Sequence, residues 1–186
     1  MSRLVSLVES REVVREIFQI LEGFSCALVG GLAVAYWVEG RVPTSRELDI
    51  LVVKEDFDEV RDLFNEIGFS VSGYAKAGVG SYTVKGKGWE VDLILAEEEW
   101  EEDAIKYAKK DVFEGVEVRI VRPEWLIVMK LVAMREKDMD DIVLLSRVVD
   151  VEKVRGLVRR YLGEDYVEDF NSLVEIGRVL SLPKRN

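Results

Sequence analysis

The feature of this sequence that most constrains the fold is a change of pattern at Pro123. Before this residue, short apolar runs with β character alternate with helical stripes, and after it only helical periodicity remains. The β-like runs lie at 25–29, 47–53, 89–96 and 116–121, with shorter runs between Phe69 and Gly88. This order predicts an α+β fold. We expect a small mixed sheet with flanking helices over residues 1–122, followed by a helical C-terminal region over 123–186 that packs on the core.

Helical stripes occur at 6–22, 31–39, 55–68 and 97–110, and again from 124 to about 180. Pro123 suits the first turn of the helix that follows it. The letters "KGKG" at 85–88 predict a hairpin turn. The stretch "VGGLAV" fits neither the Gly-x-Gly-x-x-Gly fingerprint nor the P-loop pattern, so two large classes of nucleotide-binding protein are disfavoured.

The residue types that are missing limit the chemistry. The chain has no histidine and a single cysteine, Cys26. This composition excludes Ser-His-Asp and Cys-His nucleophile systems and the zinc sites that histidine or several cysteines build. The apolar neighbours of Cys26 predict a small buried side chain. Catalysis in such a chain would depend on carboxylates, lysines, hydroxyl groups and hard metal ions.

The charge and hydropathy of the chain indicate its surroundings. The net charge of −10 argues against broad binding to nucleic acid, which requires many phosphates to be neutralised. No apolar run approaches the ~20 residues of a membrane span. Glu9 and Glu12 stand where a signal peptide would be apolar, so we expect a cytoplasmic protein. Abundant Glu, Lys and Arg with few amides is typical of thermophile proteins.

Three carboxylates stand out in the predicted strands. Glu47 and Asp49 are two residues apart and share one face of their strand, and Asp92 interrupts the apolar strand "WEVDLILA". If the two strands are neighbours, the three side chains converge on one site. Oxygen ligands of this kind suit Mg²⁺ or Mn²⁺. The alternative is a solvated strand end, with Asp92 satisfied by a partner such as Arg46 or Lys130.

Gly30 and Gly31 occupy the junction between a short buried strand and a helix. At such a junction the backbone N–H groups approach phosphate oxygens at the positive end of the helix. A tight turn or close packing is the simpler explanation of a Gly-Gly pair. Its position shortly before the acid pair makes the phosphate interpretation more specific.

Taken together, these motifs resemble a known superfamily. The stretch "VGGLAVAYWVEGRVPTSRELDILV", with Asp92 in "EVDLIL", looks like the signature of the DNA polymerase β-type nucleotidyltransferases. The later stretch "RPEWLIVMKLVAMREKDMDDIVLL" resembles the helical motif of minimal nucleotidyltransferases related to AbiEii-type toxins. The residues that match this second motif are Lys130, Arg135, Lys137, Asp138 and Asp141.

The resemblance implies roles for individual residues. Gly30 and Gly31 would contact the triphosphate, the carboxylates Glu47, Asp49 and Asp92 would bind metal and carry catalysis, and the lysines Lys130 and Lys137 would contact the nucleotide. For Asp138 and Asp141, capping of a helix is an equally good explanation.

The sequence departs from the superfamily pattern at three places. Glu47 stands where relatives usually have Asp, and Pro43 and Ser45 stand where Arg and Thr would be expected. Leu32 follows the glycine pair where relatives often have a hydroxyl residue. Lys76, Lys85 and Lys87 could line a substrate groove, although exposed hairpin lysines also discourage edge aggregation.

The leading hypothesis is therefore a metal-dependent nucleotidyltransferase that moves a nucleoside monophosphate from a triphosphate to an acceptor hydroxyl. RNA, a protein or a small molecule could be the acceptor, and an antitoxin-like protein is a further candidate partner. The alternative hypothesis is a catalytically inactive nucleotidyltransferase-like domain that serves as a nucleotide-binding or protein-interaction module.

Overall fold

The computed structural model describes residues 3–8, 11–42, 46–74 and 81–181. The chain divides into two compact units, Met1–Arg122 and Pro123–Asn186. Each unit is described by itself below.

The first unit contains a seven-stranded sheet with the order β3-β4-β5-β2-β1-β7-β6. Strands β2 and β5 run parallel, as do β1 and β7, and the other neighbours are antiparallel, so the sheet is mixed. The strands are β1 (Cys26–Val29), β2 (Glu47–Val53), β3 (Ser70–Tyr74), β4 (Tyr82–Gly86), β5 (Trp89–Ala96), β6 (Lys109–Phe113) and β7 (Val116–Ile120).

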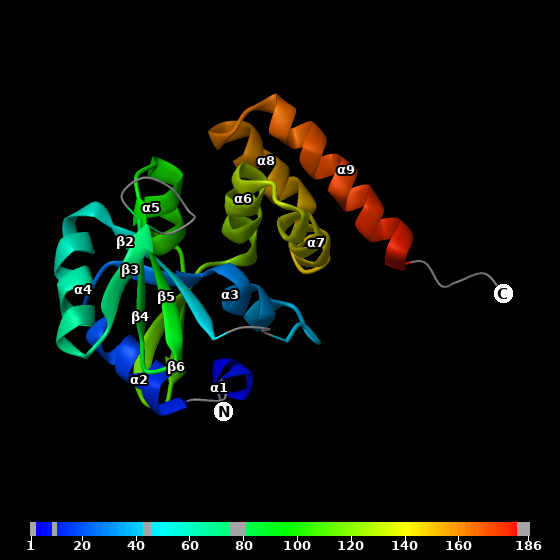
Figure 1. Cartoon of the computed structure of the whole chain (residues 1–186). Helices are drawn as coiled ribbons and strands as arrows, with labels where there is room; N and C mark the ends of the chain where they lie inside the picture. Colours follow the sequence, from blue (N-terminus) through cyan, green and yellow to red (C-terminus); the bar gives the residue numbers. More distant parts are fainter. Residues whose placement is uncertain (1–2, 9–10, 43–45, 75–80, 182–186) are drawn as a thin grey trace. The chain divides into compact units, whose positions relative to one another are not determined.

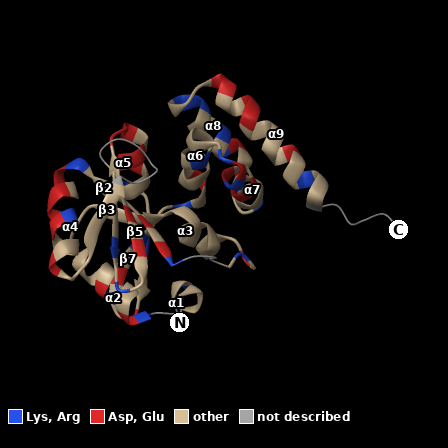
Figure 2. Ribbon diagram, viewed as in Figure 1, with Lys and Arg blue, Asp and Glu red and all other residues tan. Residues whose placement is uncertain are grey.

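Helices cover this sheet and bury its apolar side chains. They are α1 (Arg3–Leu7), α2 (Arg11–Ile20), α3 (Gly30–Trp37), α4 (Lys54–Glu66) and α5 (Glu99–Lys106). In the view of Figure 1, α4 and α3 lie on opposite sides of the strands. Figure 2 shows acidic residues along α4 and α5. The α+β class with a small mixed sheet and flanking helices is thus confirmed.

Buried and acidic side chains alternate along β2 and β5. Leu48, Ile50 and Val52 of β2 are buried, as are Val91 and Leu93 of β5. Their neighbours in sequence point to the opposite face, because successive residues of a strand alternate. The acidic residues of both strands therefore share one face of the sheet.

The hairpin turn predicted at 85–88 is present between β4 and β5. Gly86 pairs with Trp89, which leaves Lys87 and Gly88 as a two-residue loop. Both loop residues have positive φ, 53° and 78°, as the tightest hairpin turns require.

The prediction of a helix over 97–110 is wrong at its end. Helix α5 stops at Lys106, and the residues that follow form β6. This edge strand pairs with β7 across a turn in which Glu114 and Gly115 have positive φ. Pairing in the hairpin outweighs the weak helical pattern of the local sequence. The helix expected over 6–22 corresponds to α2, which covers Arg11–Ile20, whereas α1 ends at Leu7 and residues 9–10 lie outside the described ranges.

The second unit is helical, as expected. It contains α6 (Pro123–Ala133), α7 (Glu136–Leu145), α8 (Val151–Tyr161) and α9 (Glu164–Ser181), and Pro123 is the first residue of α6. Asp150 caps α8 by accepting hydrogen bonds from the N–H groups of Glu152 and Lys153. Over the part of the chain that the structure describes, no helix has both the length and the apolar character needed to cross a bilayer.

Candidate active site

The junction between β1 and α3 brings Gly30 against a carboxylate. Gly30 has a φ of 65°, in the left-handed region that favours glycine. A Cβ atom at this position would lie 1.7 Å from Oδ2 of Asp49 and 2.4 Å from its Cγ. Both the backbone conformation and the space at Gly30 therefore require glycine. Gly31, in contrast, is exposed, and a Cβ there would meet nothing within 4 Å.

The start of α3 offers backbone N–H groups to a ligand. Its N-cap is Val29, which makes no side-chain capping hydrogen bond, and the first turn contains no acidic residue. The first N–H groups of a helix have no partner within the helix and lie at the positive end of its dipole. The beginning of α3 thus suits an anion such as a phosphate group.

The register of the sheet brings two of the predicted carboxylates together. Asp49 of β2 is the direct partner of Asp92 of β5, and Glu47 is the partner of Glu90. Val29, the residue before Gly30, pairs with Asp49 on the other side of β2. Asp49 therefore lies between the start of α3 and Asp92. The juxtaposition of the two strands, on which the sequence hypothesis depended, is present.

Strand β4 contributes two polar partners to this face. The Thr83 hydroxyl donates a hydrogen bond of 2.5 Å to Oδ1 of Asp92, and the two residues are paired in the ladder. The Lys85 ammonium forms an ion pair of 2.5 Å with Glu90. The roles of Thr83 and Glu90 are not evident in the local sequence, because the pairing of β4 with β5 determines which residues face the acids. The one usable signal was the hairpin turn at Lys87 and Gly88, from which the register could have been counted.

The charges on this face affect Lys85. Its hydrogen bond with Glu90 raises the pKa of the Lys85 ammonium above its usual value, and the negative charges of Glu90, Asp92 and Glu47 act in the same direction. Lys85 therefore stays positively charged beside the carboxylates and offsets part of their charge.

A hard divalent cation fits the donor chemistry of this site. Asp49 and Asp92 offer carboxylate oxygens from neighbouring strands, and Glu47 lies two residues before Asp49 on the same face. In the described residues, no three Asp, Glu, Cys or His side chains are arranged as a ready-made metal cluster. The backbone thus brings together an aspartate pair, to which Glu47 would have to be added. Pro43 and Ser45, where the sequence departs from the superfamily pattern, lie outside the described residues, as does Lys76.

Lys130, a predicted nucleotide ligand, lies in a buried ion cluster of the second unit. Its ammonium is 2.9 Å from Oδ1 of Asp138 and 2.8 Å from Oδ2 of Asp141. The three residues are 8%, 0% and 3% exposed. Arg135 adds a further contact, since its Nε donates to Asp138 Oδ2 at 2.6 Å. Lys137, the other predicted ligand, is exposed. Nucleotide binding by either lysine stays a prediction.

Asp138 combines this ion pair with the capping role that the sequence left open. Its carboxylate accepts a hydrogen bond from the backbone N–H of Arg135, the N-cap of α7. Burial alone would raise the pKa of Asp138, but the hydrogen bonds from Arg135 and Lys130, together with their positive charges, hold it below the usual value. Asp138 is therefore an ionised, buried anchor of α6 and α7.

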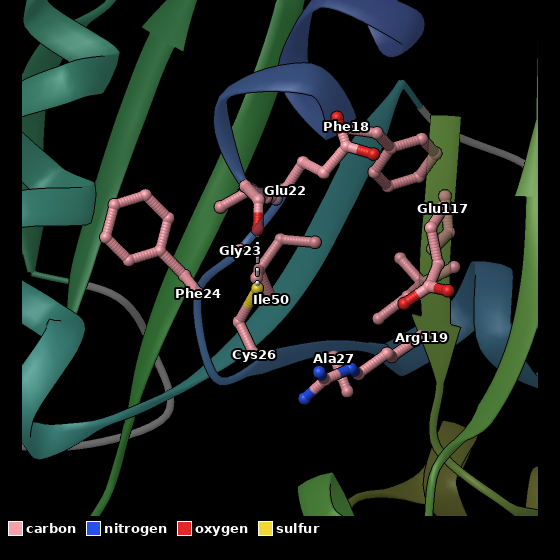
Figure 3. Close-up of a pocket in the computed structure, with 12 residues that line it drawn as sticks. Phe18, Glu22, Gly23, Phe24, Cys26, Ala27, Ile50, Glu117 and Arg119 are labelled. Atoms are coloured by element: carbon pink, nitrogen blue, oxygen red, sulfur yellow. Dashed lines mark hydrogen bonds between the residues drawn. The ribbon is translucent and has the colours of Figure 1, made fainter. Parts of the chain in front are cut away.

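A pocket lies near the beginning of β1 (Figure 3). Phe18, Cys26 and Arg119 are among its lining residues, and none of the predicted site residues is. The Cys26 thiol contacts the carbonyl oxygen of Leu21, and burial raises the pKa of Cys26 to about 12. Cys26 is thus a buried side chain, as its neighbours in the sequence predict.

The fold is similar to that of solved nucleotidyltransferases. The solution structure of the antibiotic-resistance factor ANT(2'')-Ia has a TM-score of 0.58 at 17% identity, covering 90% of this chain and 96% of that one. The lincomycin-bound lincosamide antibiotic adenylyltransferase LnuA has a TM-score of 0.52 at 13% identity, covering 76% and 99%. A putative nucleotidyltransferase from Thermotoga maritima has a TM-score of 0.52 at 19% identity, covering 75% and 91%.

These likenesses concern the fold, because the sequence identities are low. No curated protein sequence matches this chain significantly. The profile of a protein family described as "Nucleotidyl transferase of unknown function" (DUF2204) matches residues 10–176, which is most of the chain. The chain therefore belongs to this family of nucleotidyl transferases.

Proposed function

We propose that this protein is a metal-dependent nucleotidyltransferase that transfers a nucleoside monophosphate from a nucleoside triphosphate to an acceptor hydroxyl. The observation that carries the proposal is the alignment of Asp49 with Asp92 on neighbouring parallel strands, directly beside the glycine that begins α3. An anion site at a helix start next to paired carboxylates is the arrangement that phosphoryl transfer requires.

The glycines and the carboxylates of the site have different roles in this proposal. Backbone N–H groups of Gly30 and Gly31 would hold phosphate oxygens at the start of α3. Asp49 and Asp92 would hold Mg²⁺ or Mn²⁺, with Glu47 completing the set. A bound divalent ion neutralises charge that develops on the phosphates and lowers the pKa of a coordinated hydroxyl.

The transfer step balances as an in-line displacement at phosphorus. The acceptor oxygen forms a bond to the α-phosphorus, the bond from this phosphorus to the bridging oxygen breaks, and pyrophosphate leaves with the electron pair. Asp92 or Glu47 would accept the proton of the acceptor hydroxyl. The two lysines that the sequence suggested as nucleotide contacts are not equivalent. Lys137 is exposed, whereas the ammonium of Lys130 is already paired with Asp138 and Asp141.

The acceptor is one of three classes, RNA, protein or small molecule. The net charge of −10 makes a large RNA the least suitable of them. One structure with this fold, ANT(2'')-Ia, was solved with adenylyl-2''-tobramycin, so a small-molecule acceptor is compatible with the fold. We therefore rank a small molecule first.

Calorimetry with each of the four nucleoside triphosphates in the presence of Mg²⁺ tests the proposal. We expect binding of at least one triphosphate that is lost in Asp49→Asn and Asp92→Asn. Asp58→Asn is the matched control, because Asp58 is an exposed aspartate of α4 that pairs with Arg61. Unchanged metal-dependent binding in Asp49→Asn would contradict the proposed site.

A second function, nucleotide binding without catalysis, is favoured by Glu47. The longer side chain at this position moves the carboxylate by about one methylene relative to the aspartate of relatives, and no third ligand is gathered beside the aspartate pair in the described residues. Triphosphate binding with no pyrophosphate release in the presence of many candidate acceptors would support this function, whereas turnover would exclude it.

A relationship to AbiEii-type toxins, with an antitoxin-like partner, rests on the helical motif alone. Three of its residues, Lys130, Asp138 and Asp141, form the buried cluster, which supports a structural role for them. A toxin role predicts that expression of the chain arrests growth and that Asp49→Asn relieves the arrest. Normal growth during expression of the folded chain would count against it.

A further inference from the structure

Thr83 holds the carboxylate of Asp92 from the neighbouring strand β4. Its Oγ1 donates to Oδ1 of Asp92 at 2.5 Å, and the threonine is 9% exposed. A hydroxyl has a single proton to donate, so the donor of Thr83 is committed to this carboxylate. A hydrogen bond between a hydroxyl and an ionised carboxylate is short and about twice as strong as one between neutral groups.

The two aspartates of the pair are therefore held from opposite sides. Asp49 packs against the backbone of Gly30, where no Cβ would fit, and Asp92 is held by Thr83. The ladder places Thr83, Asp92 and Asp49 in one row across β4, β5 and β2. In the described part of the chain, no second hydrogen bond reaches the Asp92 side chain. Its Oδ2 is thus the oxygen that remains for a ligand.

The restricted rotation of the threonine side chain helps to keep the Asp92 carboxylate in place. A β-branched side chain in a strand has a restricted χ1, so its hydroxyl keeps its direction at low entropic cost. Lys85, the next residue of β4 on the same face, forms its ion pair with Glu90. The pairing of β4 with β5 continues on both sides of the contact between Thr83 and Asp92, from Tyr82 opposite Leu93 to Gly86 opposite Trp89.

Building on the proposed function, we propose that Thr83 is a positioning residue, which fixes the Asp92 carboxylate so that Oδ2 faces the divalent cation and the acceptor. Partners that orient metal ligands in this way typically contribute 10–100-fold, in order of magnitude, to metal affinity.

The test compares Thr83→Val, which keeps the shape but removes the hydroxyl, with Thr83→Ser, which keeps the hydroxyl. Ser72→Ala is the matched control, because the Ser72 hydroxyl belongs to the adjacent strand β3 and donates to the carbonyl oxygen of Thr83 instead of to an acid. The probe is Mn²⁺ alone, with its dissociation constant measured by calorimetry. The ¹³C chemical shift of the Asp92 carboxyl in the metal-free protein reports the hydrogen bond itself.

We expect Thr83→Val to weaken Mn²⁺ binding about tenfold and to shift the Asp92 carboxyl resonance, on the scale set by lost outer partners of metal ligands. Thr83→Ser should stay within about twofold of the wild type, and Ser72→Ala should change neither readout. Wild-type affinity in folded Thr83→Val, or equal losses in the Val and Ser variants, would overturn the positioning role while the proposed function stands. A wild-type protein that binds no Mn²⁺ would overturn both.

Discussion

Gly30 and Asp49 are in direct contact, so that a Cβ on Gly30 would lie 1.7 Å from Oδ2 of Asp49. The contact joins the start of α3 to β2, and it connects the phosphate side of the site with the carboxylate side. A change at this glycine therefore acts on both sides at once.

Gly30→Ala should abolish metal-dependent triphosphate binding. Alanine at a φ of 65° costs about 1–2 kcal/mol of folding free energy, and its methyl group also displaces the Asp49 carboxylate. Gly23→Ala separates the two effects, because Gly23 has a φ of 95° but open space around a Cβ. The measurements are calorimetric binding and urea unfolding. Equal binding in the two variants would show that the contact with Asp49 is unimportant.

Lys85→Met should tighten Mg²⁺ binding about two- to fivefold at low salt, because it removes a positive charge from beside the carboxylates. The Lys85 ammonium lies 2.5 Å from Glu90, and the charges of Glu90, Asp92 and Glu47 raise its pKa. The gain should shrink as salt is added, since the ammonium is exposed and screened. Lys87→Met is the control, because Lys87 pairs with Glu16 of α2. Unaltered affinity in Lys85→Met would place the bound cation away from this row of charges.

Lys130→Met should destabilise the protein by about 3–5 kcal/mol, since it removes the buried cation that pairs with both Asp138 and Asp141, while the contact of Asp138 with the more exposed Arg135 is kept. Lys153→Met provides the comparison. Its ammonium pairs with Glu124 but is largely exposed, so its loss should cost less than about 1 kcal/mol. Urea unfolding followed by circular dichroism measures both. Similar losses in the two variants would refute a special role for the buried cluster.

The same cluster predicts a loss of stability in acid. The pKa of Asp138 is lowered in the folded protein from the ordinary value of 3.8. The unfolded chain therefore takes up this proton at a higher pH than the folded chain does. The contribution of Asp138 to stability is complete above about pH 4 to 5 and is lost as the pH falls through the folded-state pKa.

Unfolding free energies measured between about pH 2 and pH 6, a range that spans the ordinary carboxyl pKa, check this dependence. They should fall toward the acid end of the range. Asp138→Asn should flatten part of the slope, because it removes the titrating group. Asp58→Asn, an exposed aspartate, is the comparison. A slope in Asp138→Asn as steep as that of the wild type would assign the acid sensitivity to other carboxylates.

Much of the fold could be predicted from local sequence. Apolar alternation identified β2 and β5, Lys87 and Gly88 identified the hairpin, and Pro123 marked the start of the helical unit. The strand Lys109–Phe113 could not be read in this way, because it is an edge strand with little apolar pattern. Its structure depends on pairing with β7, which is a contact between segments.

In the candidate site, too, local sequence determines some features and contacts between distant segments determine the others. The sequence by itself determined that Glu47 and Asp49 share a strand face and that Gly30 precedes a helix, because these follow from the period of a strand and from local turn chemistry. Only the tertiary structure decided that Asp49 faces Asp92, that Thr83 holds Asp92 and that Lys130 is buried between two aspartates. Strand order and register are set by the packing of the whole sheet, and no single segment contains that information.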